Sequence, residues 1–233
     1  MKTKLSILCG TVALAAPVYA GLQITNGDFQ NNTPAANTWD VDSWFNSYPT
    51  AAGQVNNWWW EGTWYGPTVS PNGTSVMGLG YMFTTPHWAY QGIGVNDGGL
   101  PSLNLQFDVG SFTDAGVARN MGVTLSLYQS DGTFVGADNS DIAGAAGVTL
   151  IDSVSLTSGS LNPGQVVTLQ TALNLASANN TGGLFLRFIN YSTGTGEPWA
   201  AIDNVMIVPV PEPSSLALLG LGGLGLLLRR RSA

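Results

Sequence analysis

The chain contains little positive charge and almost no cysteine. Its 233 residues include seven lysines and arginines, fourteen aspartates and glutamates, and one cysteine. Within residues 21–208 the cations are Arg119 and Arg187, against thirteen carboxylates, which gives a net charge of −11. Such a surface cannot track a phosphate backbone by counterion release, and it repels anionic polysaccharides unless a divalent metal bridges them. Nucleic acid is therefore excluded as a partner.

Residues 21–208 also lack thiols and lysine. The one cysteine, Cys9, precedes this stretch, so residues 21–208 cannot form a disulfide. Their stability has to come from packing, with a bound metal as a further source. Glycine, serine, threonine and asparagine are abundant, which disfavours long helices and favours short strands joined by turns. The length suits one domain with a full core.

Three features follow one another at the C-terminus. Pro211-Glu212-Pro213 precedes an apolar run, 216–228, which ends at Arg229-Arg230-Arg231. As a helix the run would rise about 20 Å, less than the roughly 30 Å hydrocarbon core of a bilayer. The arginines hold this end on the cytoplasmic side. A short hydrophobic sorting helix with transient membrane association is predicted, and an ordinary tail anchor is the alternative.

These C-terminal residues resemble the PEP-CTERM sorting signal of Gram-negative bacteria. The resemblance implies that a membrane protease of the exosortase type cleaves near Pro211-Glu212-Pro213 and releases the protein to the cell surface or the extracellular matrix. We therefore assign residues 209–233 to a sorting signal.

The N-terminus predicts a signal peptide over residues 1–20. Two lysines precede the apolar stretch 5–16, and Val18-Tyr19-Ala20 places small residues at the two positions that signal peptidase reads. Cleavage after Ala20 leaves 21–208 as the exported domain. A lipoprotein signal at Cys9 is the alternative, but the residues before Cys9 are not the small ones that such a site requires.

Apolar and polar residues alternate over 103–109 and 123–127, which predicts half-buried strands. The turn sequence Ser130-Asp131-Gly132-Thr133 predicts a hairpin between 121–128 and 133–136. Further strands are predicted near 22–25, 75–80, 89–95, 149–156, 165–169, 184–189 and 201–208. This spacing is typical of an all-β, antiparallel β-sandwich.

Three short motifs in the body of the chain resemble galactose-binding-like jelly-roll domains, which include many carbohydrate-binding modules. They are Asn26-Gly27-Asp28-Phe29, Ala89-Tyr90-Gln91 and Ala201-Ile202-Asp203-Asn204-Val205. The resemblance implies that the first and last strands are neighbours and that one structural calcium ion lies between them.

Asp28 and Asp203 are the calcium ligands that the resemblance implies, completed by backbone carbonyls. Gln30 stands where the family often has an acidic residue, which removes one charged ligand. Alternation along the last strand puts Asp203 on the same face as Val205 and Ile207, so its carboxylate should be buried and in need of a partner. Without metal, Asp203 would accept backbone N–H groups and Asp28 would cap a turn.

Aromatic residues are densest between Trp39 and Tyr90. Neighbours in a strand point to opposite sides, so Trp58, Trp59 and Trp60 cannot all face one core. An exposed indole suits the C–H face of a sugar ring. We therefore predict a carbohydrate contact at Trp58, Trp59, Trp60, Trp64 and Tyr65. The alternative is that these side chains pin long loops onto the sandwich.

Together these features predict an exported, non-catalytic surface or matrix protein that binds neutral carbohydrate or exopolysaccharide. One alternative is a structural matrix protein without specific sugar binding. A glycoside hydrolase is the second alternative, and it is disfavoured because Glu61 and Glu197 are the two glutamates of 21–208 and no acid–base pair is evident.

Overall fold

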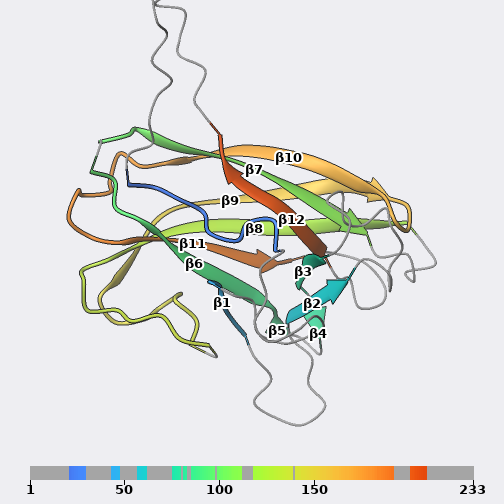
Figure 1. Ribbon diagram of the computed structural model, residues 1–233, viewed down its shortest axis with the longest axis horizontal. Coiled ribbons are helices and arrows are strands. Elements are labelled where there is room, and N and C mark those ends of the chain that lie inside the picture. Colours follow the sequence, from blue (N-terminus) through green and yellow to red (C-terminus); the bar gives the residue numbers. More distant parts are fainter. Residues whose placement is uncertain are drawn as a thin grey trace, which may run out of the picture. The chain divides into compact units, whose positions relative to one another are not determined.

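The computed structural model describes residues 21–29, 43–47, 57–61, 75–79, 81–82, 85–97, 99–111, 118–138, 140–191 and 200–208, with the main chain alone at 57–61, 75, 81–82 and 85–86. These residues form twelve strands and no helix (Figure 1). The strands make two five-stranded antiparallel sheets and a two-stranded ribbon. The all-β, antiparallel fold class predicted from the sequence is confirmed.

We call the two large sheets sheet I and sheet II. Sheet I has the strand order β1 (Phe45–Asn46), β6 (Trp88–Gly94), β11 (Leu184–Asn190), β8 (Arg119–Ser130) and β9 (Val148–Leu161). Sheet II has the order β10 (Val166–Asn174), β7 (Ser102–Ser111), β12 (Ala200–Ile207), β3 (Ser75–Leu79) and β2 (Asn57–Glu61). The ribbon pairs β4 (Tyr81–Met82) with β5 (Thr85–Pro86).

The core lies between the two sheets, as the alternating segments require. Leu103, Leu105, Phe107 and Val109 of β7 are fully buried, and so are the apolar residues that alternate along β8 and β11. Phe107 of sheet II meets Phe188 of sheet I edge-on, with ring centroids 5.3 Å apart. Burial of this apolar surface is the main source of stability in a domain without disulfides.

The N-terminal loop is tied to both sheets. The Gln91 side chain accepts from Thr25 N–H and donates to the carbonyls of Thr25 and Ser43, each at 2.8 Å. Val205 N–H of β12 donates to Gly27 O at 2.8 Å. The N-terminal loop and the last strand are therefore neighbours, although residues 22–29 do not form the first strand that the resemblance implied.

Most of the predicted strands are present, but two predictions were wrong. Residues 22–25 form a loop in which Leu22 makes an isolated bridge with Gly94. The hairpin between 121–128 and 133–136 does not form, because β8 pairs with β9 and β11 instead. Residues 131–147 are a long connection whose side chains pack on sheet I, so the turn sequence starts a loop, not a second strand.

A bulge in β12 changes the face of Asp203. Asp203 pairs with Asp108 of β7, and the register shifts before Met206, where Asn204 has a φ of 51°. Ile202 and Val205 both belong to the core, so Asp203 lies on the outer face. The prediction that Asp203 shares a face with Val205 and Ile207 was therefore wrong, although the residue is buried, with 1 % of its surface exposed.

Candidate functional site

The predicted tryptophan run lies in β2, at one edge of sheet II. Trp58, Trp59 and Trp60 pair with Gly78, Met77 and Val76 of β3. Met77 belongs to the core, so position 59 lies on the core face of the sheet, and positions 58 and 60 lie on its outer face. Trp64 and Tyr65, the other two predicted contacts, lie outside the described residues.

The outer face of sheet II carries a row of hydrogen-bonded polar residues. Asp108 accepts from the Thr168 hydroxyl at 2.5 Å and from the Asn204 amide at 2.7 Å. Asp203 accepts from Asn204 N–H at 2.8 Å. Asp108 was not predicted as a site residue. In the sequence it cannot be told apart from an ordinary solvent-exposed polar residue of an alternating strand.

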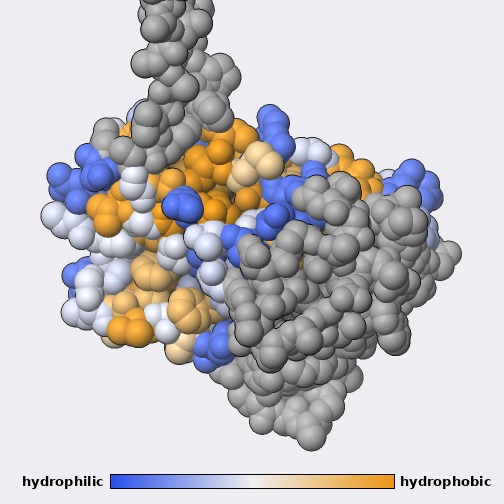
Figure 2. Space-filling view, in the orientation of Figure 1, coloured by the Kyte–Doolittle hydropathy of each residue, from blue (hydrophilic) through white to orange (hydrophobic). Residues whose placement is uncertain are grey.

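Exposed amides and hydroxyls lie at the β10 side of this face, whereas its centre at β12 is buried. Gln170 of β10 donates to Gln106 of β7 at 2.6 Å, and Thr168 and Gln170 are exposed. Figure 2 shows apolar residues at the surface near the end of β12, where 42 % of Met206 is exposed. The face thus combines neutral hydrogen-bonding groups with some apolar surface.

Sheet I gathers a different set of aromatic residues on its outer face, and these are covered. Trp88, Tyr90 and Tyr128 are buried together with Ile142 of the connection 131–147. Trp88 and Tyr90 stack with centroids 5.6 Å apart. Trp44, also part of the aromatic-rich region, is buried in the core between Phe29 and Phe188. These aromatic side chains therefore contribute to packing on both sides of sheet I.

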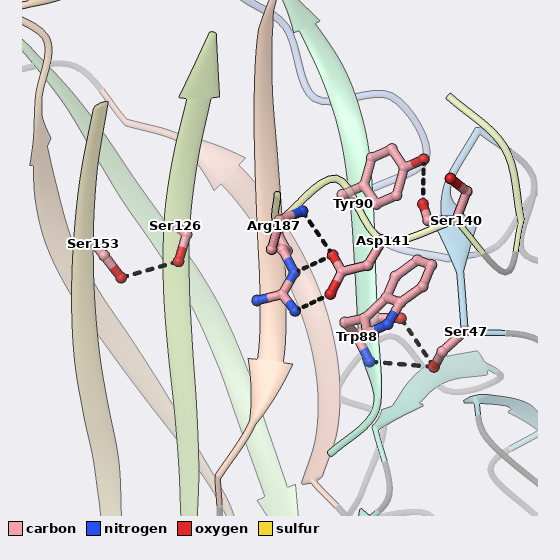
Figure 3. A network of polar contacts seen from close by, with 9 residues as sticks. Ser47, Trp88, Tyr90, Ser126, Ser140, Asp141, Ser153 and Arg187 are labelled. Carbon is pink, nitrogen blue, oxygen red and sulfur yellow. Dashed lines mark hydrogen bonds and ion pairs between the residues drawn. The ribbon is translucent and has the colours of Figure 1, made fainter. Parts of the chain in front are cut away.

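One polar row crosses the outer face of sheet I (Figure 3). The hydroxyls of Ser126 and Ser153 lie 2.9 Å apart. Next to them, Arg187 donates from Nε and Nη2 to the Asp141 carboxylate at 2.8 and 2.6 Å. At the β6 end, the Tyr90 hydroxyl donates toward the carbonyls of Ala137 and Ser140.

These contacts fasten the connection 131–147 onto the sheet. Arg187 is buried and Asp141 partly so, with side-chain exposures of 8 % and 28 %. A desolvated guanidinium needs such a bidentate partner. Neither residue was predicted, because the 46 positions that separate them hide the pairing.

The two predicted calcium ligands differ in environment. Asp28 is exposed in the N-terminal loop, and Asp203 is buried in β12. Among the described residues no group of three or more His, Cys, Asp or Glu side chains could hold a metal ion. The predicted site was two aspartates completed by backbone carbonyls, so calcium at Asp28 and Asp203 stays a prediction.

His87 is buried immediately before β6, with 2 % of its surface exposed. Burial lowers its pKa from 6.5 to about 4. His87 therefore takes up a proton near pH 6.5 in the unfolded chain, but only near pH 4 in the folded protein. The stability contributed by the neutral imidazole is complete above pH 6.5 and falls as the pH drops toward 4.

We expect this loss to reach up to about 3 kcal/mol. Urea unfolding of the wild type and of His87→Gln, at neutral pH and between the two pKa values, measures it. The variant should lose this part of the acid dependence. An equally steep fall in the variant would contradict the assignment to His87.

Comparison with known proteins supports the C-terminal assignment. Residues 209–231 match the PEP-CTERM protein-sorting motif. The motif indicates an exported protein that an exosortase sorts. No curated protein matches the sequence. The matched residues lie outside the described part of the chain, and within that part no helix has the length and apolar character needed to cross a membrane.

Several solved structures are similar in shape at low sequence identity. The arabinose-bound MgGH51 α-L-arabinofuranosidase matches with 16 % identity and a TM-score of 0.49, over 82 % of this chain and 26 % of the enzyme. The chain thus spans about a quarter of that protein. TmCBM61 in complex with β-1,4-galactotriose matches with 10 % identity and a TM-score of 0.46, over 81 % of this chain and 99 % of the module.

A family 11 carbohydrate-binding module from Clostridium thermocellum, in complex with a mixed-linked tetrasaccharide, matches with 14 % identity and a TM-score of 0.45. The match covers 82 % of this chain and 97 % of the module. The chain is therefore a β-sandwich protein with a PEP-CTERM sorting motif.

Proposed function

We propose that the exported protein is a non-catalytic, neutral-polysaccharide-binding protein of the cell surface or extracellular matrix. The observation that carries the proposal is the register of β2. It places positions 58 and 60 of a three-tryptophan run on the outer face, at the edge of sheet II. Tryptophan at two outer-face positions of an edge strand is suited to stacking on sugar rings, and the β10 side of the same face carries exposed neutral amides and hydroxyls.

Charge favours a neutral polymer as the ligand. The residues 21–208 carry a net charge of −11, and one of their two arginines, Arg187, is occupied by Asp141. A uronate polymer would meet repulsion with little to offset it. A neutral glycan needs hydrogen-bonding groups and apolar contact instead, and sheet II supplies both kinds of group.

The described carboxylates on the outer face of sheet II accept hydrogen bonds from neighbouring residues, which suits a structural role better than a catalytic one. Both oxygens of Asp108 accept hydrogen bonds, from Thr168 and Asn204. Asp203 also accepts a hydrogen bond and is buried. A glycosidase needs a protonated acid and a second carboxylate within reach of a bound sugar. These contacts support a non-catalytic role.

Delivery requires two processing partners. We propose that signal peptidase removes residues 1–20 and that an exosortase-type protease acts at the sorting motif while the C-terminal segment is in the inner membrane of a Gram-negative bacterium. The Pro211-Glu212-Pro213 element and the cluster Arg229-Arg230-Arg231 would position that step.

Co-sedimentation with insoluble neutral polysaccharides tests the binding proposal. We expect wild-type protein to sediment with at least one polymer, and Trp58→Ala and Trp60→Ala each to weaken binding about tenfold, since a central aromatic contact is worth more than about 1 kcal/mol. Leu150→Ala, at an exposed position of sheet I, serves as the control and should bind normally.

A structural matrix protein without sugar specificity predicts a different result. In that case no polymer would retain the protein, or the two tryptophan variants would be retained as well as the wild type. Circular dichroism of each variant shows whether its fold is intact. Repeating the assay with a chelator tests whether calcium at Asp28 and Asp203, which stays a prediction, contributes to binding.

A further inference from the structure

A hollow of about 400 Å³ opens at one end of the sandwich, away from β2. It is lined by the end of β8, the start of β9 and the connection between β10 and β11. Figure 1 shows that the β8–β9 and β10–β11 connections emerge at the same end of the two sheets. The volume lies at the low end of the range for small-ligand sites, which suits one or two sugar rings.

Buried hydrogen bonds hold the β10–β11 side of the hollow in place. The Gln129 amide, 6 % exposed, donates to the carbonyls of Asn179 and Gly182 at 2.9 and 3.2 Å, and it accepts from Asn179 N–H at 3.0 Å. The Asn179 side-chain oxygen in turn accepts from both donors of Thr181 and from Gly182 N–H. The position of Asn179 is therefore fixed before any ligand arrives.

The opposite side is fixed by the base of the connection 131–147. Asp131 N–H donates to Gly147 O at 2.8 Å, and Asp131 Oδ1 accepts from the Thr133 hydroxyl and N–H at 2.6 and 2.9 Å. Gly147 has a φ of +72°, and a Cβ there would lie 2.6 Å from Asp131 Oδ1. Glycine is required at 147 for this closure.

Four polar groups remain available on the residues that line the hollow. Asp131 Oδ2 and Asn179 Nδ2 make no hydrogen bond with another described residue, and neither do the hydroxyls of Thr149 and Ser177. All four residues are exposed. The hydrogen bond from the Thr133 hydroxyl, and to a lesser extent that from Thr133 N–H, holds the pKa of the Asp131 carboxyl below its usual range. The hollow thus presents an ionised acceptor, an amide donor and two hydroxyls.

We propose that this hollow is a second carbohydrate site, which binds a single neutral pyranose at the end of a glycan chain. Asp131 Oδ2 accepts from one ring hydroxyl, and the Asn179 amide donates to a second. Val148 and Ile151 supply apolar contact for the C–H face of the ring. The ligand class rests on the proposed function, whereas the site is separate from β2.

The charge of the hollow restricts its ligand to neutral sugars. Its described lining residues include the carboxylate of Asp131 and no lysine or arginine. A uronic acid would place a second negative charge beside Asp131 without a compensating cation. Discrimination between a hexose and its uronate is therefore a signature of this site.

Isothermal titration calorimetry of the full chain tests the proposal, in a polyoxyethylene detergent that carries no sugar. The probes are methyl glucoside, methyl galactoside and glucuronate. We expect at least one methyl glycoside to bind with a Kd in the millimolar range and glucuronate to give no heat. Absence of heat with both glycosides at about 50 mM would overturn the proposal.

Two variants test whether the glycoside binds in the hollow. Asp131→Asn keeps an oxygen for Thr133 and replaces the free acceptor by a donor, and Asn179→Asp keeps the oxygen that accepts from Thr181 and Gly182. Each should weaken glycoside binding at least tenfold, whereas Asp97→Asn, an exposed aspartate elsewhere, should not. Unchanged affinity in a folded Asp131→Asn or Asn179→Asp protein would overturn the assignment.

The same assay separates this site from the tryptophan face. A protein with Trp58→Ala and Trp60→Ala should lose polymer sedimentation and keep glycoside binding, which supports the second site. Loss of glycoside binding in that protein, with its fold intact, would place the sugar at β2 and overturn the proposal. Glycoside binding in a chain that sediments with no polymer would refute the proposed function alone.

Discussion

Replacing Pro211, Glu212 and Pro213 by alanine is expected to keep the protein in the membrane fraction and to abolish its release. The sequence of these residues belongs to a matched sorting motif. We expect the apolar run 216–228 and the three arginines that follow it to hold the chain at the inner membrane until the protease acts. Without the recognition element, nothing releases it.

Cell fractionation with immunoblotting measures this outcome. Wild-type protein should appear outside the inner membrane as a shortened chain, and the triple variant should remain as a longer, membrane-bound form. Ser214→Ala is a matched control next to the element and should be processed normally. Release of the triple variant at the wild-type rate would show that Pro211-Glu212-Pro213 does not direct the step.

Replacing Asp141 by alanine is expected to cost about 3 kcal/mol of unfolding free energy, because it leaves the Arg187 guanidinium buried without its anion. The carboxylate receives two charge-assisted hydrogen bonds at 2.6 and 2.8 Å. The change would also free the connection 131–147 over the buried aromatic cluster. Urea denaturation followed by tryptophan fluorescence measures the loss.

A double-mutant cycle gives the control. Arg187→Met removes the charge while filling similar space, so Arg187→Met combined with Asp141→Ala should be more stable than Asp141→Ala alone. This ordering follows from the cost of an unpaired buried cation. If the double variant is the less stable of the two, that cost is not what Asp141 offsets.

Strands that alternate over several residues could be predicted from the sequence. Segments 103–109 and 123–127 became β7 and β8, because each has one face in the core and one outside it. The predicted hairpin after Tyr128 failed for a nonlocal reason. Turn residues at 130–133 fix a local change of direction, but the partner strand of β8 is decided by packing across the sheet.

The candidate sites were predictable to a smaller extent. The tryptophan run was visible as composition, and the β2 register then placed it at a sheet edge. The face of Asp203 could not be predicted, since a single bulged residue reverses the alternation. The hollow beside Asp131 and Asn179 joins two connections far apart in sequence, and no local pattern marks it.

Affinity electrophoresis measures whether the protein binds neutral polysaccharide through β2, with native gels that contain either a neutral or a uronate-bearing polysaccharide. We expect the wild-type protein to be retarded in a neutral gel, the retardation to be lost when Trp58 and Trp60 are replaced by alanine, and a uronate gel to have no effect. Retardation that is equal in both gels, or that persists without the two tryptophans, would contradict the claim of neutral-glycan binding through β2.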